Sequence, residues 1–244
     1  MKENKYDDDV FFDRYSRMPR SVDGLAAAGE WHELRRILPS LSDKRVLDLG
    51  CGFGWHCRYA EELGASRVVG VDISEKMLAV ARKKSRAGVI EYVHSPIEDY
   101  SCPPGSFDVV VSSLALHYVE SFERVCRAVG QALVGGGVFV FSVEHPVFTA
   151  YGSQDWIRDG NGARLHWPVD GYFHEGRRNA VFLGENVIKY HRTLTTYLHG
   201  LIEAGFGLLD VVEPRPEEGL LDSVPDMRDE MRRPMMLLVS SRKP

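Results

Sequence analysis

The segment 46–54 constrains the fold of this chain more than any other, and it reads Val-Leu-Asp-Leu-Gly-Cys-Gly-Phe-Gly. Its apolar start predicts a buried strand, and its glycines predict a tight turn directly after that strand. The amphipathic run 55–63 then predicts a helix, and Gly64 is suited to end it. Glycines between a strand and a helix let the backbone approach a ligand closely, so the segment predicts a ligand-binding site.

The residues around the glycines distinguish this loop from two other glycine-rich loops. A dinucleotide-binding fingerprint requires a third glycine at the position of Trp55, which disfavours an NAD-dependent oxidoreductase. A phosphate-binding P-loop requires Gly-Lys followed by Ser or Thr, and this pattern is absent after the turn. Asp48 stands two residues before the first glycine, where a carboxylate repels a pyrophosphate but suits a ligand that carries an ammonium or sulfonium charge.

A second acidic residue, Asp72, lies 22 residues after Gly50, at the end of the next predicted strand. At this distance in a strand–helix–strand unit, a carboxylate reaches ribose hydroxyls. Both acids also have a purely structural interpretation. Asp48 can bond local backbone amides at a strand end, and Asp72 can cap the helix that starts near Ser74.

Taken together, these residues resemble the class I S-adenosylmethionine (SAM) dependent methyltransferases, most closely the small-molecule branch with type 11-like domains. Three later segments resemble the family's fourth strand, its fifth strand and the helix end before its sixth strand, namely 105–113, 135–142 and 201–206. The resemblance covers roughly residues 40–145 and 192–242. It implies a Rossmann-like α/β fold and an enzyme that transfers a methyl group from SAM, leaving S-adenosylhomocysteine.

The order of the predicted elements agrees with this fold. Strands are expected at 46–49, 67–71, 89–93, 108–112, 137–143, 207–213 and 235–241. Helices are expected at 30–38, 55–63, 75–85, 121–134 and 193–204, and a proline-rich loop at 214–234. Their alternation predicts a parallel sheet flanked by helices, to which the resemblance adds an antiparallel last strand. We therefore expect one domain over residues 1–244, with a helical segment at 1–40 that closes the site.

Charge and cysteine content limit the possible partners. The net charge of −5 argues against a nucleic-acid-binding surface, which needs a basic face. The four cysteines form no Cys-x-x-Cys pair or zinc spacing, so no metal site is expected. The acidic N-terminus lacks a signal peptide, and the longest apolar run, 138–143, is too short to span a bilayer. We expect a cytoplasmic protein without nucleic-acid or membrane partners.

The segment 145–191 interrupts the alternation of strands and helices and shows no clear helix. It holds 8 of the chain's 25 aromatic residues and leaves the carboxyl end of a strand, where open α/β sheets bind ligands. We interpret it as a lid that carries the substrate pocket, with Trp156, Trp167 and Tyr172 against the substrate. The alternative is a small separate core packed on the edge of the sheet. Its four histidines lack the spacing of metal ligands.

The resemblance also implies which residues hold SAM. The glycine loop would bind the methionine part, Asp72 the ribose and an apolar slot the adenine. The expected cofactor residues are Asp48, Gly50, Cys51, Gly52, Gly54, Asp72, Ile73, Met77, Ile97 and Ser113. Met77 is equally suited to an ordinary helix core. Pro96 stands where the family often has an acid near the adenine, and Glu98 or Asp99 could replace that acid.

Methyl transfer from a sulfonium is an in-line displacement, so the protein mainly supplies alignment and a dry site. His117, after the fourth strand, and His145, at the end of the fifth, are candidate general bases; each can instead be a structural histidine. A base is not obligatory if the acceptor is already nucleophilic. Tyr15, and with it Arg20, is expected to fold over the site from the N-terminal segment.

Two other functions remain open at this point. An RNA methyltransferase would use the same cofactor motif, although the acidic net charge disfavours it. A SAM-binding protein without catalytic activity would also carry this motif. The sequence leaves the methyl acceptor and the oligomeric state open.

Overall fold

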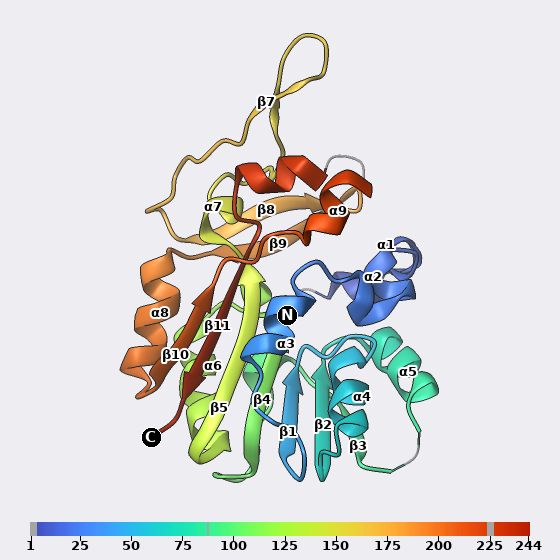
Figure 1. The fold of residues 1–244 in the computed structure, drawn as a ribbon, viewed down its shortest axis with the longest axis vertical. Coiled ribbons are helices and arrows are strands. Elements are labelled where there is room, and N and C mark those ends of the chain that lie inside the picture. The colour runs from blue at the N-terminus through green and yellow to red at the C-terminus, as the bar shows by residue number, and fades with distance from the viewer. Residues whose placement is uncertain (1–3, 87, 224–226) are drawn as a thin grey trace.

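The computed structural model describes residues 4–86, 88–223 and 227–244, and within them a seven-stranded sheet forms the centre of the molecule (Figure 1). Its strands are β1 (Arg45–Leu49), β2 (Arg67–Asp72), β3 (Ile90–His94), β4 (Phe107–Ser113), β5 (Leu133–Glu144), β10 (Gly207–Val212) and β11 (Met236–Arg242). They lie in the order β10-β11-β5-β4-β1-β2-β3, and β11 runs antiparallel to both of its neighbours. The expected Rossmann-like sheet with an antiparallel last strand is confirmed.

Both faces of this sheet are apolar, so helices pack against each of them. The helices beside it are α3 (Trp31–Ile37), α4 (Trp55–Glu62), α5 (Glu75–Lys84), α6 (Phe122–Ala132) and α8 (Leu194–Glu203). On β1, Val46 packs with Cys57 of α4, whereas its neighbour Leu47 belongs to the cluster that contains Val125 of α6. Successive residues of a strand point to opposite faces, so α4 and α6 cover opposite sides of the sheet.

The strand order changes direction between β1 and β4. From β1 the chain proceeds through β2 to β3 on one side, and it then returns to place β4 and β5 on the other side. The loops after β1 and β4 consequently diverge at the carboxyl ends of two neighbouring strands. Open α/β sheets bind ligands in the crevice at such a switch point.

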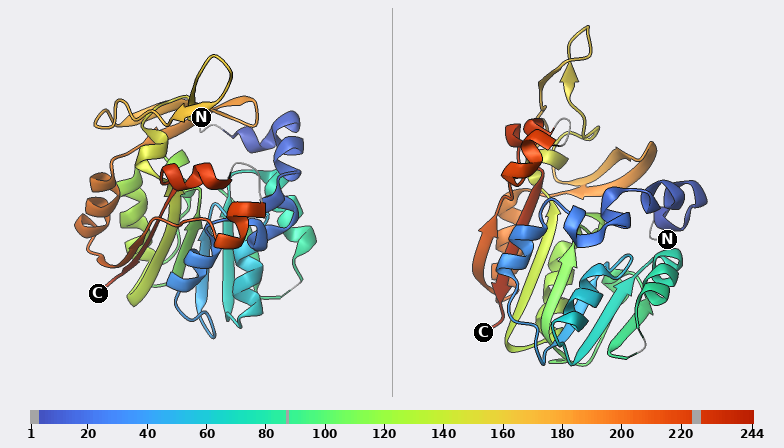
Figure 2. Two further views of the ribbon diagram at one scale, coloured as in Figure 1. Left: turned by 45° about the horizontal axis from the view of Figure 1, so that its top comes forward. Right: turned by 45° about the vertical axis from the view of Figure 1, so that its right-hand side comes forward.

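Two segments outside the regular alternation lie above these carboxyl ends, as the two views of Figure 2 show. The N-terminal segment contains η1 (Lys5–Asp7), α1 (Asp9–Ser16), α2 (Pro19–Val22) and η2 (Gly24–Ala27). The insert after β5 contains α7 (Pro146–Thr149), β6 (Ile157–Arg158), β7 (Arg164–His166), β8 (Gly176–Phe182) and β9 (Glu185–His191). The insert is therefore built from two hairpins, β6–β7 and β8–β9, where the sequence had indicated mainly loops.

The helix expected at 121–134 ends earlier than its sequence pattern indicates. Its last residue is Ala132, and Leu133 already pairs with Phe107 of β4 as the first residue of β5. The apolar pattern continues across this boundary, so periodicity alone does not reveal the change from helix to strand.

The expected loop at 214–234 is also partly wrong. It contains α9 (Glu218–Ser223) and η5 (Met227–Arg232), while residues 224–226 lie outside the described residues. Such short helical turns between prolines are too brief to show a helical period. Two further short helices, η3 (Ile97–Asp99) and η4 (Leu116–Tyr118), follow β3 and β4. In the described part of the chain, no helix is both long and apolar enough to cross a membrane.

Candidate active site

A cavity of about 600 Å³ lies at the carboxyl ends of β1, β2, β4 and β5. The loops after these strands form its floor. Residues 4–27 and the hairpin at 176–191 cover it from above, and together we call them the roof. The two parts of the roof contact each other, because Phe11 packs with Val187 of β9 and Arg14 Nη1 donates a 2.7 Å hydrogen bond to Leu183 O.

The roof is also bonded to the floor beside β2. Ser74 Oγ and Lys76 N, at the start of α5, donate hydrogen bonds of 2.5 Å and 3.1 Å to Asp7 Oδ1. Asn4 Nδ2 donates a 3.0 Å bond to Ile73 O. Residues 4–7 are thus placed directly over the end of β2.

The glycine loop after β1 forms one wall of the cavity. Gly50, Gly52 and Gly54 have φ angles of 78°, 52° and 71°, a region that favours glycine. A Cβ atom at Gly50 would overlap the side chain of Ala115, and one at Gly54 would overlap Tyr92. At Gly52 a Cβ atom would meet no atom within 4 Å, because this residue borders the open cavity.

Cys51 and Gly54 occupy different places within this loop. Cys51 lines the cavity, and its backbone amide donates a 3.0 Å bond to Val71 O on β2. Gly54 begins α4 as its N-cap residue and is outside the cavity wall. The importance of Gly54 is therefore the left-handed turn into the helix.

Asp72 presents its carboxylate at the junction of the two strands that carry the site. Asp72 Oδ2 accepts a 2.8 Å hydrogen bond from Gly52 N, and Oδ1 accepts a 2.9 Å bond from Ser74 N. The side chain lines the cavity with 9% of its surface exposed, and burial raises the pKa of its carboxyl group. Ser74 itself caps α5 by accepting a bond from Met77 N, so Asp72 is not the helix cap.

Asp48 lies deeper than the sequence interpretation supposed. It is 1% exposed and outside the cavity wall, and its Oδ2 accepts a 3.3 Å bond from the thiol of Cys57. Its other oxygen, Oδ1, has no hydrogen-bond partner among the described residues. Burial raises the pKa of Asp48 to about 7. The expected direct contact with a ligand ammonium group stays a prediction.

Apolar side chains line the cavity next to Asp72. Ile73 and Met77 come from the end of β2 and from α5, and Ile97 comes from η3 after β3. Met77 is only 2% exposed, so it belongs to the core and to the cavity wall at once. Of the two acids proposed to replace the family's acid, Glu98 lines the cavity. This corner provides a narrow apolar slot of the kind that suits an aromatic base.

The segment after β4 forms the opposite wall. Ser113 accepts a 3.2 Å bond from Ser142 Oγ, and Leu114 has a φ of 51°, a rare backbone conformation for a residue with a branched side chain. The amide of Leu114 donates a 2.9 Å bond to Ser142 O, which helps to hold this conformation. Such local strain is concentrated at functional sites.

His117 lines the same wall in a defined state of protonation. It is 2% exposed, and burial lowers its pKa to about 4, so the imidazole is neutral near neutral pH. Its Nδ1 accepts a 3.3 Å bond from Glu144 N. The proton of the neutral ring is consequently on Nε2. His117 therefore offers a hydrogen-bond donor rather than a general base.

Glu144, the last residue of β5, also lines the cavity, and sequence reasoning missed its partners. Lys189 Nζ, on β9, donates hydrogen bonds of 2.5 Å to Glu144 Oε1 and 2.9 Å to Gln154 Oε1. Gln154 Nε2 in turn donates a 2.8 Å bond to Glu144 Oε2. Lys189 is only 2% exposed, so this is a buried ion pair between the sheet and the insert. No local sequence signal connects residues so far apart.

Known proteins share this arrangement. The sequence profile of the methyltransferase-domain family matches residues 47–141. A solved structure from Listeria monocytogenes, assigned as a SAM-dependent methyltransferase, is 55% identical, covers 91% of this chain and 99% of its own, and has a TM-score of 0.86. A SAM-dependent methyltransferase structure from Mesorhizobium loti is 47% identical over 90% of this chain and 100% of its own, with a TM-score of 0.84.

This chain belongs to the SAM-dependent methyltransferases. An uncharacterized Haemophilus influenzae protein is 33% identical to this methyltransferase over 98% of this chain and 96% of its own. SAM is the cofactor of the enzyme, and the cavity fits it on three points seen above. Gly52 leaves space for a ligand at the loop, Asp72 exposes a carboxylate to it, and Asp48 retains an unpartnered oxygen beneath it.

Two relatives with named reactions match part of this methyltransferase. A malonyl-[acyl-carrier protein] O-methyltransferase from Pectobacterium atrosepticum is 30% identical over 60% of this chain and 54% of its own. A ubiquinone biosynthesis O-methyltransferase from Bordetella pertussis is 39% identical over 42% of this chain and 44% of its own. The chain thus spans about half the length of these two proteins.

His145, the second candidate base, is outside the cavity wall of the methyltransferase. Its Nδ1 accepts a 3.1 Å bond from Val147 N and caps α7, and its Nε2 lies 2.9 Å from Glu213 Oε1. The Nδ1 atom thus has a structural partner, whereas Nε2 lies beside Glu213 without a hydrogen bond among the described residues. This placement favours the structural alternative, and a role of His145 as a base stays a prediction.

The three aromatic residues proposed for the substrate pocket also lie outside the cavity wall. Trp156 and Trp167 pack at 5.3 Å, and the guanidinium of Arg233 lies 4.3 Å from the Trp167 ring. Tyr172 Oη accepts a 3.1 Å bond from Leu194 N at the start of α8. Trp156 and Trp167 form a small separate cluster with Phe148, which agrees with the alternative interpretation of the aromatic content, whereas Tyr172 packs with Phe173 and His191.

The roof residues Tyr15 and Arg20, by contrast, line the cavity as expected. The Tyr15 ring contacts Phe53 of the glycine loop at 5.8 Å, and Arg20 forms an ion pair with buried Glu30. The hairpin β8–β9 adds a further set of wall residues that sequence reasoning did not find. These are Arg177, Phe182, Val187, Ile188 and Tyr190.

Proposed function

We propose that this methyltransferase transfers the methyl group of SAM to a small molecule held in the same cavity. The observation that carries this proposal is the roof, since residues 4–27 and 176–191 turn the cofactor crevice into a chamber of about 600 Å³. Pockets for small molecules have volumes of about 300–1,000 Å³. The name of one partial relative, a ubiquinone biosynthesis O-methyltransferase, supports a small acceptor, whereas the other name, malonyl-[acyl-carrier protein] O-methyltransferase, gives an acceptor attached to a carrier protein.

Three groups of wall residues suit the three parts of SAM. The backbone of Gly50, Cys51 and Gly52 would hold the methionine part. Asp72 would accept hydrogen bonds from the ribose hydroxyls, because its carboxylate has further lone pairs beyond its two amide bonds. Ile73, Met77 and Ile97 would enclose the adenine, which adjoins Asp72. SAM supplies the electrophilic methyl group when it is bound.

The residues at the acceptor end align the substrate and exclude water. His117 donates from Nε2 to an oxygen of the acceptor, while its neutral state prevents it from taking a proton near neutral pH. Glu144 is neutralised by Lys189 and hydrogen-bonded by Gln154, so it does not act as a free base either. An acceptor in this site therefore arrives already nucleophilic, and catalysis rests on alignment in a closed site.

The roof provides that closure. Segments 1–40 and 145–191 are the parts of the chain that we propose to exclude water, with β8–β9 rather than the tryptophans as the part of the insert beside the acceptor. The roof has few buried apolar residues of its own, and such elements open at low free-energy cost. Hydrogen exchange of residues 176–191 should therefore slow strongly on addition of S-adenosylhomocysteine, whereas β1 should show little change.

The test of the proposed function is turnover. The enzyme is incubated with SAM and a panel of phenols, carboxylic acids and thiols, and formation of S-adenosylhomocysteine is measured. Bulk tRNA and rRNA are tested in parallel. Turnover with a small molecule supports the proposal, whereas turnover with RNA alone contradicts it. SAM binding without turnover on any acceptor would instead indicate a cofactor-binding protein without catalytic activity.

A further inference from the structure

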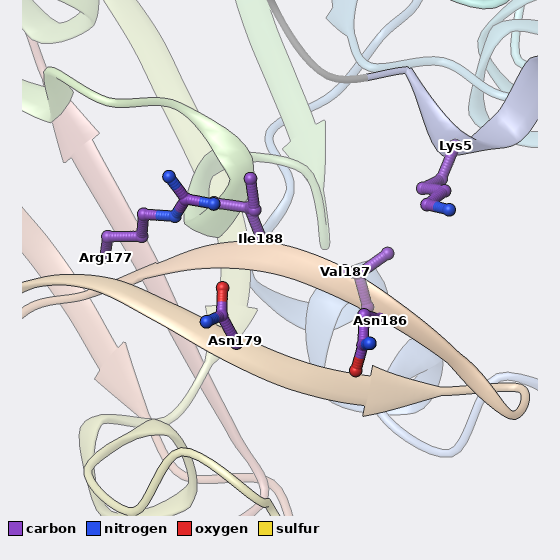
Figure 3. A pocket seen from close by; sticks show the side chains of 6 residues that line it. All are labelled: Lys5, Arg177, Asn179, Asn186, Val187 and Ile188. Carbon is purple, nitrogen blue, oxygen red and sulfur yellow. The ribbon is translucent and has the colours of Figure 1, made fainter.

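A second hollow of about 380 Å³ adjoins the main cavity under the roof. The residues that line it are Lys5, Arg177, Asn179, Asn186, Val187 and Ile188. Lys5, Arg177, Val187 and Ile188 also line the main cavity, so the two hollows are neighbours that share part of their walls. Figure 3 shows Arg177 and Lys5 at opposite sides of this side pocket, with Ile188 and Val187 of β9 between them.

The side pocket has an unbalanced positive charge. Its described lining residues include two cations and two amides, and no carboxylate. In the part of the chain that the structure describes, the side chains of Lys5 and Arg177 have no ion-pair partner. Unpaired cations that face one hollow attract an anion to it, even where the hollow is partly open to solvent.

The other charged groups of the main cavity are already engaged. Arg20 pairs with Glu30, Glu144 pairs with Lys189, and Asp72 is bonded to two backbone amides. The remaining carboxylates of the wall, Glu98 and Glu120, lie on the η3 and η4 side. They repel an anionic group from that side and so direct it toward Arg177.

We propose that the side pocket binds an anionic group of the methyl acceptor: a carboxylate, sulfonate or phosphate. This inference rests on the proposed function, in which the acceptor occupies the main cavity. Arg177 would hold the anion through its planar fork of donors, Lys5 would add a second charge, and Asn179 and Asn186 offer amide donors. Val187 and Ile188 lie between the two hollows, so the acceptor should have an apolar body between its acidic group and its methyl-accepting atom.

The proposal is tested with pairs of ligands that differ only in charge. Hexanoate is compared with hexanamide, and 4-hydroxyphenylacetate with 4-hydroxyphenylacetamide, by calorimetry in the presence of saturating S-adenosylhomocysteine. Each acid should bind about ten- to a hundredfold more tightly than its amide, which is the range for a charge-assisted hydrogen bond. High salt should weaken the binding of the acids but not of the amides, because the side pocket is partly open to solvent.

Variants at the pocket provide the matched control. Arg177→Gln should abolish most of the preference for the acid, and Lys5→Gln should reduce it. Arg127→Gln, which removes an exposed arginine of α6 outside both hollows, should leave it unchanged. Inorganic phosphate should compete with the acids on the wild-type enzyme and much less on Arg177→Gln.

Two results would overturn the inference. One is an acid that binds no more tightly than its amide to the wild-type enzyme. The other is a preference for the acid that survives in both pocket variants. The affinity for S-adenosylhomocysteine is measured on every variant and should stay within a factor of about two, since neither residue belongs to the glycine loop. If the wild-type enzyme itself did not bind S-adenosylhomocysteine, that result would contradict the proposed function and not the anion site.

Discussion

Replacing Lys189 with methionine tests how strongly the insert is bound to the sheet. Lys189 is 2% exposed and donates to Glu144 Oε1 at 2.5 Å and to Gln154 Oε1 at 2.9 Å. Methionine has a similar length and flexibility but no charge. The variant therefore removes the cation and leaves the carboxylate of Glu144 in the same buried place.

The expected loss of stability follows from leaving the carboxylate of Glu144 buried without its cationic partner. Breaking a buried ion pair by removing one partner costs about 3–5 kcal/mol, whereas replacing both partners with apolar residues is often close to neutral. Lys189→Met should thus lower the free energy of unfolding by about 3–5 kcal/mol. The double variant Lys189→Met/Glu144→Leu should recover most of this loss. The effect is strongly non-additive because the two side chains are in direct contact.

The pH dependence of the free energy of unfolding provides a second, independent test of this ion pair. Burial alone raises the pKa of Glu144, but the charges of His117 and Lys189 and the hydrogen bonds of Lys189 and Gln154 outweigh it and hold the pKa below its ordinary value. In the wild-type protein this contribution to stability is present above the ordinary carboxyl pKa and is lost as the pH falls through the lowered one. In Lys189→Met, burial dominates and Glu144 takes up a proton. The deficit of the variant should therefore shrink as the pH is lowered.

Urea denaturation of the wild-type protein and of the variants at several pH values measures these differences. Lys83→Met, which removes an exposed lysine of α5, is the control and should change the free energy of unfolding by less than about 0.5 kcal/mol. The reasoning fails if Lys189→Met behaves like this control. It also fails if the effects of the two single variants simply add in the double variant.

Three further variants test the floor of the cavity. Asp72→Ala leaves the amides of Gly52 and Ser74 without their acceptor, so the free energy of unfolding, measured by denaturation, should fall by about 2–6 kcal/mol. The affinity for S-adenosylhomocysteine, measured by calorimetry, should fall about ten- to a hundredfold. Unchanged stability would show that these two hydrogen bonds do not contribute to it. Burial raises the pKa of Asp48 to about 7, so the stability of the ligand-free protein should fall as the pH rises from about 4 to about 7, and Asp48→Asn should remove this slope. Gly50→Ala should lower the melting temperature for two reasons: residue 50 has a left-handed backbone conformation, and the new Cβ atom overlaps the side chain of Ala115. Adding Ala115→Gly should relieve only the overlap. If the double variant melted at the wild-type temperature, a backbone cost at Gly50 would be contradicted.

The sequence predicts well those features whose physical cause is local. The strand, turn and helix at 45–62 follow from apolar residues, positive φ angles and a helix end within one continuous stretch. The end of that helix is an example, because Gly64 adopts a φ of 79° and Ala65 N bonds back to Ala60 O at 3.0 Å, as expected for a glycine C-cap. The parallel sheet flanked by helices likewise follows from the alternation of strands and helices.

Features that depend on contacts between distant segments could not be predicted in this way. Lys189 and Glu144 meet across 45 residues, and neither position is unusual in its local sequence. The aromatic content of the insert was visible, but not the direction of its rings. Trp156 and Trp167 pack around Arg233, which lies far from them in the sequence, near the C-terminus. Composition gives the presence of a cluster, while the fold decides whether that cluster faces a ligand.

His117 illustrates a third case, in which the residue was found and its chemistry was not. An unperturbed histidine titrates near neutral pH, which makes it a natural candidate for a general base. Burial lowers its pKa to about 4, and the bond from Glu144 N occupies the nitrogen that would take the proton. The hydrogen bond comes from Glu144 of β5, a strand that follows His117 in the chain. The role of a histidine is therefore set by its partners in space.

The roof connects the two ends of the cavity through one small cluster. Phe11 of the N-terminal segment packs with Ala180 and Val187 of the hairpin, apart from the main core of the sheet. Asp7, in the same segment, is bonded to the start of α5 beside the cofactor wall, while the hairpin carries Arg177 beside the acceptor wall. A movement that opens one part of the roof must therefore disturb the other. We therefore expect release of S-adenosylhomocysteine and exchange of the acceptor to share one opening step, with a cost set by this small cluster rather than by the stability of the sheet.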